Sequence, residues 1–152
     1  TSLVVDSSSI SSLSGIEAFT SLTFFICGIN QLTSIDLSSN NALLFLSLAT
    51  NQLTSLDVSA NINLETLYCG WNQLTSIDLS SNTNLISLWC SNNQLTSLTL
   101  GTGIDLNNLV LNAIDNDASL VIHVGTSARV TLAQSLFTVA NLDISTGTTF
   151  AI

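Results

Sequence analysis

The chain has 152 residues, of which 46% are hydrophobic and 7% are charged; one basic residue against ten Asp and Glu gives a net charge of −9. Nucleic acid and anionic membrane surfaces require clustered cations, and Arg129 stands alone, so neither is an expected partner. No run of about 18 uninterrupted apolar residues is present, and we expect no membrane insertion. A surface with so few charges leaves apolar area exposed, which favours an association site.

Residues 1–21 are predicted to form an N-terminal capping coil. Leu3, Val5, Ile10 and Leu13 follow a degenerate version of a pattern that recurs further along the chain, but without its asparagine. Residues 15–19 have the length of one helical turn, which we expect to cover the first coil.

Residues 22–111 contain a repeat of constant length. The motif Asn-Gln-Leu-Thr-Ser begins at positions 30, 51, 72 and 93, a constant interval of 21, within the frame L-x-x-L-x-L-x-x-N-x-L. A fixed period of this length predicts a solenoid in which each coil adds one strand to a parallel ladder. Stacked asparagines satisfy backbone groups where the chain leaves each strand, so we assign a structural role to these four side chains: Asn30, Asn51, Asn72 and Asn93.

The second half of each repeat copies the first in shorter form, as in residues 35–40, 56–61 and 77–82. Each half has too few residues for a helix and is rich in Ser and β-branched residues, which predicts a second short extended segment on the opposite wall. The predicted fold is therefore mainly β, a leucine-rich-repeat solenoid of about six coils with two parallel ladders.

The regular period fails after Leu111 in the frame Leu106-x-x-Leu109-x-Leu111. Residues 112–152 are predicted to form a C-terminal strand-helix-strand cap, with strands at 120–124 and 142–144 and a helix at 131–139 between them.

The nested 21-residue pattern resembles the bacterial leucine-rich repeats of secreted and surface proteins, especially those of Bacteroidota-like bacteria. The resemblance covers about residues 1–111. It implies an extracellular or cell-surface protein that acts in binding, adhesion or assembly rather than catalysis.

Solvent-facing aromatic and aliphatic side chains recur at equivalent positions of the first predicted strand and of the turn after it. Because neighbouring rungs are about 4.8 Å apart, Tyr68, Trp71 and Trp89 are expected to form one cluster. The strand positions form two columns at the repeat interval. The first contains Phe24, Phe45, Thr66, Ser87 and Asn108, and the second contains Ile26, Ser47, Tyr68, Trp89 and Val110. We call the following set the aromatic wall: Phe24, Ile26, Ile29, Phe45, Tyr68, Trp71 and Trp89. Three occupants remain open: another protein subunit, a glycan, or the chain's own C-terminal cap.

Asp36, Asp57 and Asp78 form a second exposed column at the same pitch. Three like charges at this spacing repel, so they are expected either to have raised pKa values or to attract a cation such as Ca²⁺. A solvated acidic stripe is the favoured interpretation, and no cofactor or metal is predicted. The segment 115–117 lacks the Gly and Glu of an EF-hand loop and is interpreted as a turn.

Three cysteines, Cys27, Cys69 and Cys90, occupy an inward position and are predicted to be buried thiols. His123 is the chain's one histidine and lies in an apolar predicted strand, where a structural role is expected. No nucleophile motif, paired catalytic carboxylates, metal-ligand cluster or phosphate loop is visible, so no enzyme activity is predicted.

These observations lead to two functional hypotheses. The first is a non-enzymatic extracellular subunit that assembles with copies of itself into a surface filament or fibril, through the aromatic wall and strand-rich ends. The alternative is a monomeric adhesin module that binds a glycan or a protein.

Overall fold

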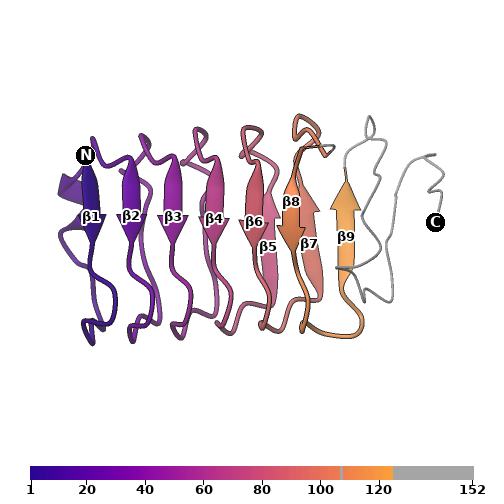
Figure 1. The fold of residues 1–152 in the computed structure, drawn as a ribbon, viewed down its shortest axis with the longest axis horizontal. Coiled ribbons are helices and arrows are strands. Elements are labelled where there is room, and N and C mark those ends of the chain that lie inside the picture. The colour runs from indigo at the N-terminus through magenta and orange to yellow at the C-terminus, as the bar shows by residue number, and fades with distance from the viewer. Residues whose placement is uncertain (107, 125–152) are drawn as a thin grey trace.

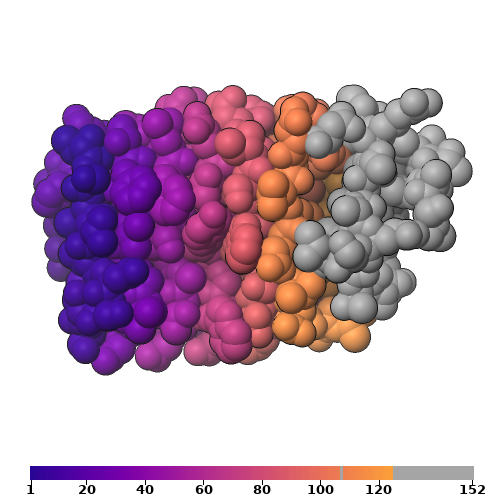
Figure 2. All heavy atoms as spheres, viewed as in Figure 1, coloured from indigo at the N-terminus to yellow at the C-terminus, as the bar shows by residue number. Residues whose placement is uncertain are grey.

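The computed structural model describes residues 1–106 and 108–124, which form a β-solenoid of stacked coils. The first sheet has six parallel strands in the order β1-β2-β3-β4-β6-β8. These strands are β1 (Ser2–Val4), β2 (Phe24–Ile26), β3 (Phe45–Ser47), β4 (Thr66–Tyr68), β6 (Ser87–Trp89) and β8 (Val110–Asn112). Figure 1 shows them side by side along the long axis, and Figure 2 shows the coils as contiguous bands.

The second sheet is parallel and shorter, in the order β5-β7-β9. Its strands are β5 (Ser76–Leu79), β7 (Ser97–Leu100) and β9 (Val121–Val124), which run opposite to the first sheet in Figure 1. The fold class and both parallel ladders are therefore as predicted. The second-wall segments of the earlier repeats, 35–37 and 56–58, are not strands, although Leu37 and Val58 are buried at the same inward positions.

The interior consists of inward side chains stacked from coil to coil. The middle residue of each central strand is fully buried and lies opposite its counterpart in the next strand: Phe25, Leu46, Leu67 and Leu88. In a three-residue strand only the middle side chain points inward, so the side chains of the first and last positions point to the outer face. Each coil therefore presents two side chains on the outer face of the first sheet.

The predicted asparagines hold each coil to the preceding one. Asn51 Oδ1 accepts a hydrogen bond from Leu32 N at 3.0 Å, while its Nδ2 donates to Cys27 O at 2.9 Å and to Leu48 O at 3.1 Å. Asn30, Asn72 and Asn93 make equivalent bonds. These buried carboxamides supply the donors and acceptors that the turning backbone lacks.

A second column of asparagines lies at the end of the second wall, at Asn40, Asn61 and Asn82. All three are fully buried, and each Nδ2 donates to two backbone carbonyls; Asn61 donates to Leu37 O at 3.2 Å and to Asn40 O at 3.0 Å. Their Oδ1 atoms have no hydrogen-bond partner in the structure. The first asparagine column therefore pairs with both backbone N–H and C=O groups, whereas the second pairs with C=O groups alone.

The first coil has β1 in register with β2 and ends in η1 (Ile16–Ala18), a 3-10 helix at the predicted helical turn. This coil lacks its own asparagine, and Asn30 of the next coil accepts hydrogen bonds from Ser8 N and Ile10 N. The degenerate coil is therefore stabilised from its neighbour.

The last described coil is longer than the repeat. Leu111 lies opposite Leu88, which places it two positions beyond the regular interval, and Asn116 makes the bonds of the asparagine column, from Leu95 N and to Cys90 O. β9 confirms the strand predicted at 120–124, and it extends the second sheet. The predicted helix at 131–139 and strand at 142–144 lie outside the described residues, so the boundaries of the C-terminal cap stay a prediction.

Candidate binding surface

The outer face of the first sheet places the predicted columns side by side. Phe24 pairs with Phe45 across β2 and β3, and Tyr68 pairs with Trp89 across β4 and β6. Ile26 occupies the second column beside Ser47, which in turn lies opposite Tyr68. Tyr68 and Trp89 therefore lie on the same side of the molecule.

The rings on this face form a continuous chain across four strands. The ring centroids of Phe24 and Phe45 are 4.5 Å apart and stacked, those of Phe45 and Tyr68 are 5.4 Å apart and edge-on, and those of Tyr68 and Trp89 are 5.6 Å apart. Because Phe45 is in the first column and Tyr68 in the second, the chain of rings crosses the face diagonally. Such ring pairs contribute about 0.5–1.5 kcal/mol each beyond the area they bury.

Trp71 lies in a separate column, at the turn after β4, and no ring contact joins it to the others among the described residues. The predicted cluster of Tyr68, Trp71 and Trp89 is therefore a ring pair beside a separate indole. Trp71 is 62% exposed and Trp89 is 45% exposed, so both indoles are open to a partner.

The column of Trp71 has a backbone conformation that L residues rarely adopt. Its members have φ between 50° and 59°, in the left-handed region: Ile29, Thr50, Trp71, Asn92 and Asp115. Asn and Asp tolerate this region, but a bulky or β-branched residue there is an outlier that costs about 1–2 kcal/mol relative to a right-handed conformation. Ile29 and Trp71 are also exposed, so neither is explained by packing into the core.

Strand β8 corrects the predicted end of the two strand columns. Ser87 lies opposite Val110, and Trp89 lies opposite Asn112, so Val110 belongs to the first column and Asn108 to neither. The loop before β8 is two residues longer than the repeat allows. The constant 21-residue interval therefore placed this strand two residues too early. Val110 is 53% exposed and adds an aliphatic side chain to this face.

Carboxylates flank the wall at both edges. Exposed Glu65 directly precedes β4, and exposed Asp115 occupies the column of Trp71. At the N-terminal end, Asp6 accepts a hydrogen bond from Gly28 N and is partly occupied in holding that turn. The described residues contain no Lys or Arg, because the chain's one basic residue is Arg129.

The acidic column on the second wall is exposed, as expected for a solvated stripe, but its pKa values are not raised. Each carboxylate accepts a hydrogen bond from the backbone N–H two residues on, at 2.9 Å: Ser38 for Asp36, Ser59 for Asp57 and Ser80 for Asp78. Hydrogen bonds from the side chain and backbone of these serines lower the pKa of all three aspartates, so the expectation of raised pKa values is wrong. Stabilisation by local donors outweighs repulsion between exposed carboxylates that water screens.

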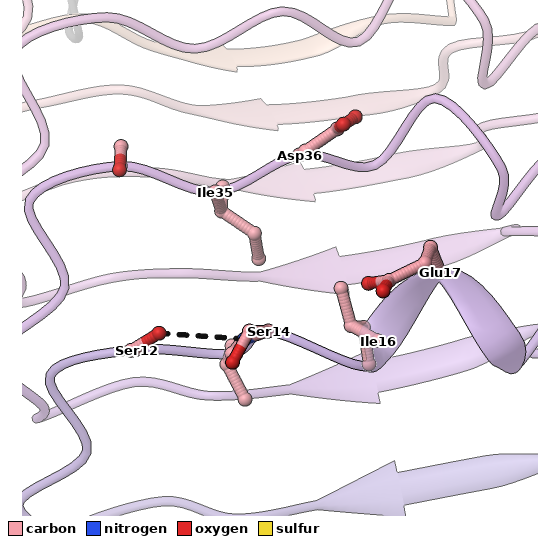
Figure 3. Close-up of a pocket in the computed structure, with 8 residues that line it drawn as sticks. Ser12, Ser14, Ile16, Glu17, Ile35 and Asp36 are labelled. Atoms are coloured by element: carbon pink, nitrogen blue, oxygen red, sulfur yellow. Dashed lines mark hydrogen bonds between the residues drawn. The ribbon is translucent and has the colours of Figure 1, made fainter.

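Small hollows lie beside this second wall. A cavity of about 210 Å³ lies between the first two coils and includes Ser12, Ser14, Glu17 and Asp36 in its lining, as Figure 3 shows. Within the described residues, no group of three or more His, Cys, Asp and Glu side chains is arranged to hold a metal ion. Asp36, Asp57 and Asp78 each bond to the serine of their own turn.

Cys27, Cys69 and Cys90 are buried free thiols. Burial raises the pKa of Cys69 well above its usual range and that of Cys90 to about 12, which keeps both thiols protonated and unreactive at neutral pH. His123 lies in β9 beside Thr99 of β7. Within residues 1–106 and 108–124, no helix has the length and hydrophobicity needed to cross a bilayer.

Three features of the structure were not predicted from the sequence. The left-handed turn column carries little sequence signal, because Gly is absent from it and only Asn92 and Asp115 are residue types that favour this region. The second asparagine column was visible at 40, 61 and 82 as the end of each half-repeat, but its burial was not. Asn116 was preceded by Leu111 and Ala113 in the spacing of the repeat, a signal that could have placed the last coil.

Together, the repeat, the two parallel ladders and the asparagine column define a β-solenoid of the leucine-rich-repeat type. Residues 62–108 match the family model described as Leucine Rich repeats (2 copies). No curated protein matches the chain.

Among solved structures, two similar chains come from Listeria monocytogenes. One is the functional domain of InlJ, which includes a cysteine ladder, with 24% identity and a TM-score of 0.32. The other is an internalin (inlF), with 21% identity and a TM-score of 0.49. The matches cover 82% and 84% of the present chain, but 44% and 48% of those two, so the chain spans less than half their length.

Proposed function

We propose that this chain is a non-catalytic binding protein that contacts another macromolecule through the aromatic wall. The observation that carries the proposal is Trp71: an indole held 62% exposed on a backbone with φ of 57°. Gly or Asn would occupy this position at lower conformational cost, and the exposed indole gains little from the core. A partner that buries the indole accounts for both features.

The rest of the wall has the composition of a binding site. Trp and Tyr are the residue types most often found as anchors at the centre of interfaces, and here Tyr68 and Trp89 stand in contact beside Trp71. Exposed aliphatic side chains extend the surface on either side, with Ile29 59% and Val110 53% exposed. Contiguous exposed apolar area on a protein with few charges marks an interaction site.

Self-assembly into a filament is the second candidate. The exposed apolar side chains of the wall and the absence of Lys and Arg among the described residues favour it, because basic residues are a common protection against edge and face association. Net charge of −9 on every copy opposes it at low ionic strength. A filament subunit should therefore associate more readily as salt increases.

An extracellular or cell-surface setting in a bacterium, with an adhesin-type role, is part of the proposal. It is supported by the resemblance of the nested repeat to secreted and surface leucine-rich-repeat proteins.

The test compares three proteins: the parent chain, the double variant Trp71→Ser and Trp89→Ser, and the control Ile62→Ser. Ile62 is an exposed aliphatic residue, 54% exposed, that is not part of the wall and directly follows Asn61 of the second asparagine column. Binding is measured to lysozyme as a basic protein, serum albumin as an acidic protein and a soluble β-glucan. Sedimentation velocity and negative-stain imaging at low and high salt follow self-association.

We expect at least one binding or self-association signal that the parent and Ile62→Ser share and the double variant loses. Uniform fibres that disappear in the double variant would select self-assembly. Equal behaviour of all three proteins in every assay would refute a role for the wall in binding.

A further inference from the structure

The charged side chains described around the aromatic wall are all acidic. Glu65 and Asp115 flank the face, and the described residues carry no Lys or Arg to offset them. Carboxylates on the second wall, such as Asp57, are bound to their own turns through serine donors. The wall therefore combines exposed rings with an uncompensated negative field.

The residues that carry the flanking carboxylates lie close to the rings along the backbone. The Cα atoms of Glu65 and Tyr68 are separated by three residues of extended chain, about 10 Å. Asp115 is two rungs from Trp71 in the same column, also about 10 Å at a rung spacing of about 4.8 Å. An Arg or Lys side chain that lies on a ring can span a distance of this order to a carboxylate. The distances are also close to the Debye length of about 8 Å at physiological salt, so the attraction is only partly screened.

We propose that the occupant of the aromatic wall is a cationic protein segment, which lays Arg or Lys side chains over Tyr68, Trp71 and Trp89 and pairs their charges with Glu65 and Asp115. This inference rests on the proposed binding function of the wall and names its partner class. Cations are attracted to the faces of Trp and Tyr rings, and Arg more often than Lys because its planar guanidinium stacks on them. Positive charge is also what the flanking carboxylates recognise.

The same features disfavour the other occupants. Phosphorylated or acidic ligands meet carboxylates at both edges and no compensating Lys or Arg in the described residues. A second copy of the chain brings the same negative charge to the contact. A neutral glycan can stack on the rings but gains nothing from Glu65 and Asp115, so it is the alternative outcome of the test.

The test uses three acetylated and amidated peptides of equal length, in which Gly-Ser spacers separate three Arg, three Lys or three citrulline residues. Citrulline has the shape of Arg without its charge. Both tryptophans of the chain lie on the wall, so intrinsic fluorescence reports binding directly. Binding of the soluble β-glucan is measured in parallel.

We expect saturable binding in the order Arg, Lys, citrulline, with affinity for the Arg peptide falling roughly tenfold between 0.05 and 0.5 M salt. Trp71→Ser should weaken binding of the Arg peptide roughly tenfold or more, with Trp89 as the remaining reporter. Glu65→Gln should weaken it about two- to fivefold. The control Asp57→Asn removes the same charge from the opposite wall and should change affinity less than twofold.

Three results would overturn the inference. Equal affinity for the Arg and citrulline peptides, lost in Trp71→Ser, would leave the wall a binding surface that does not select cations. Tight binding of the β-glucan with no binding of the Arg peptide would assign the wall to a neutral glycan. Equal effects of Glu65→Gln and Asp57→Asn would show that net charge, and not the wall, attracts the peptide.

Discussion

Replacement of Asn51 by Ala should be one of the most damaging single changes in the repeats. Asn51 Oδ1 is the acceptor for Leu32 N, and Nδ2 is the donor to Cys27 O and Leu48 O. Leu48 O retains a second bond from Asn72 Nδ2 at 3.0 Å, so two buried backbone groups lose the bond that Asn51 provides. At about 1–3 kcal/mol for each of the two groups, the free energy of unfolding should fall by about 4 kcal/mol, within a range of about 2–6 kcal/mol.

Replacement of Asn61 by Ala is the matched control. Asn61 is at least as buried as Asn51, and its Nδ2 also donates to two carbonyls, Leu37 O and Asn40 O. Each of these carbonyls already accepts a backbone N–H, and the Oδ1 of Asn61 has no partner to lose. The expected cost is therefore about 1–2 kcal/mol, roughly 2 kcal/mol less than for Asn51→Ala.

Urea unfolding followed by far-ultraviolet circular dichroism measures both variants against the parent chain. Tryptophan fluorescence, which reports on the first wall, provides a second probe of the same transition. If Asn61→Ala is as destabilising as Asn51→Ala, or more so, the number of orphaned backbone groups does not set the cost and the reasoning fails.

Three further predictions concern the wall, the acidic column and the thiols. Trp71→Gly should be more stable than Trp71→Ala by about 1 kcal/mol in urea unfolding, because only Gly adopts a φ of 57° without strain, although both remove the indole; equal stability would contradict the strain. Hydrogen bonds from Ser59 hold the pKa of Asp57 below its ordinary value of 3.8, so this carboxylate stabilises the fold above that pH and the contribution is lost as pH falls through the lowered pKa. Asp57→Asn should therefore reduce the drop in melting temperature between pH 6 and pH 3, and an unchanged drop would count against the bond. Cys69 and Cys90 should resist iodoacetamide at pH 8 in the folded chain and react in urea, because burial raises the pKa of both thiols; rapid labelling of the folded chain would contradict their burial.

The repeat alone was enough to predict which side chains share a column wherever the coils have equal length. Tyr68 and Trp89 are one full repeat apart in the sequence, and the strands pair them directly. The prediction failed for Val110, because the coil before β8 is longer than the repeat and the loop absorbs the difference. A period specifies register only while it is constant.

Local chemistry decided the features that the period does not encode. Asp57 was expected to have a raised pKa from its neighbours in the column, but a serine two residues away along the chain lowers it. The left-handed backbone at Ile29 and Trp71 follows from the tight turn between the strand and the asparagine, and these residue types give no hint of it.

The sequence by itself determined the class of fold, because identical spacing of Leu and Asn forces successive coils to stack their apolar side chains and their turn carboxamides in register. Tertiary structure alone decided how the wall is presented. The diagonal chain of rings from Phe24 to Trp89 and the isolated, exposed indole of Trp71 depend on side-chain packing across coils and on turn dihedrals. The chain of rings is not a property of any one repeat, because it arises only where neighbouring coils meet.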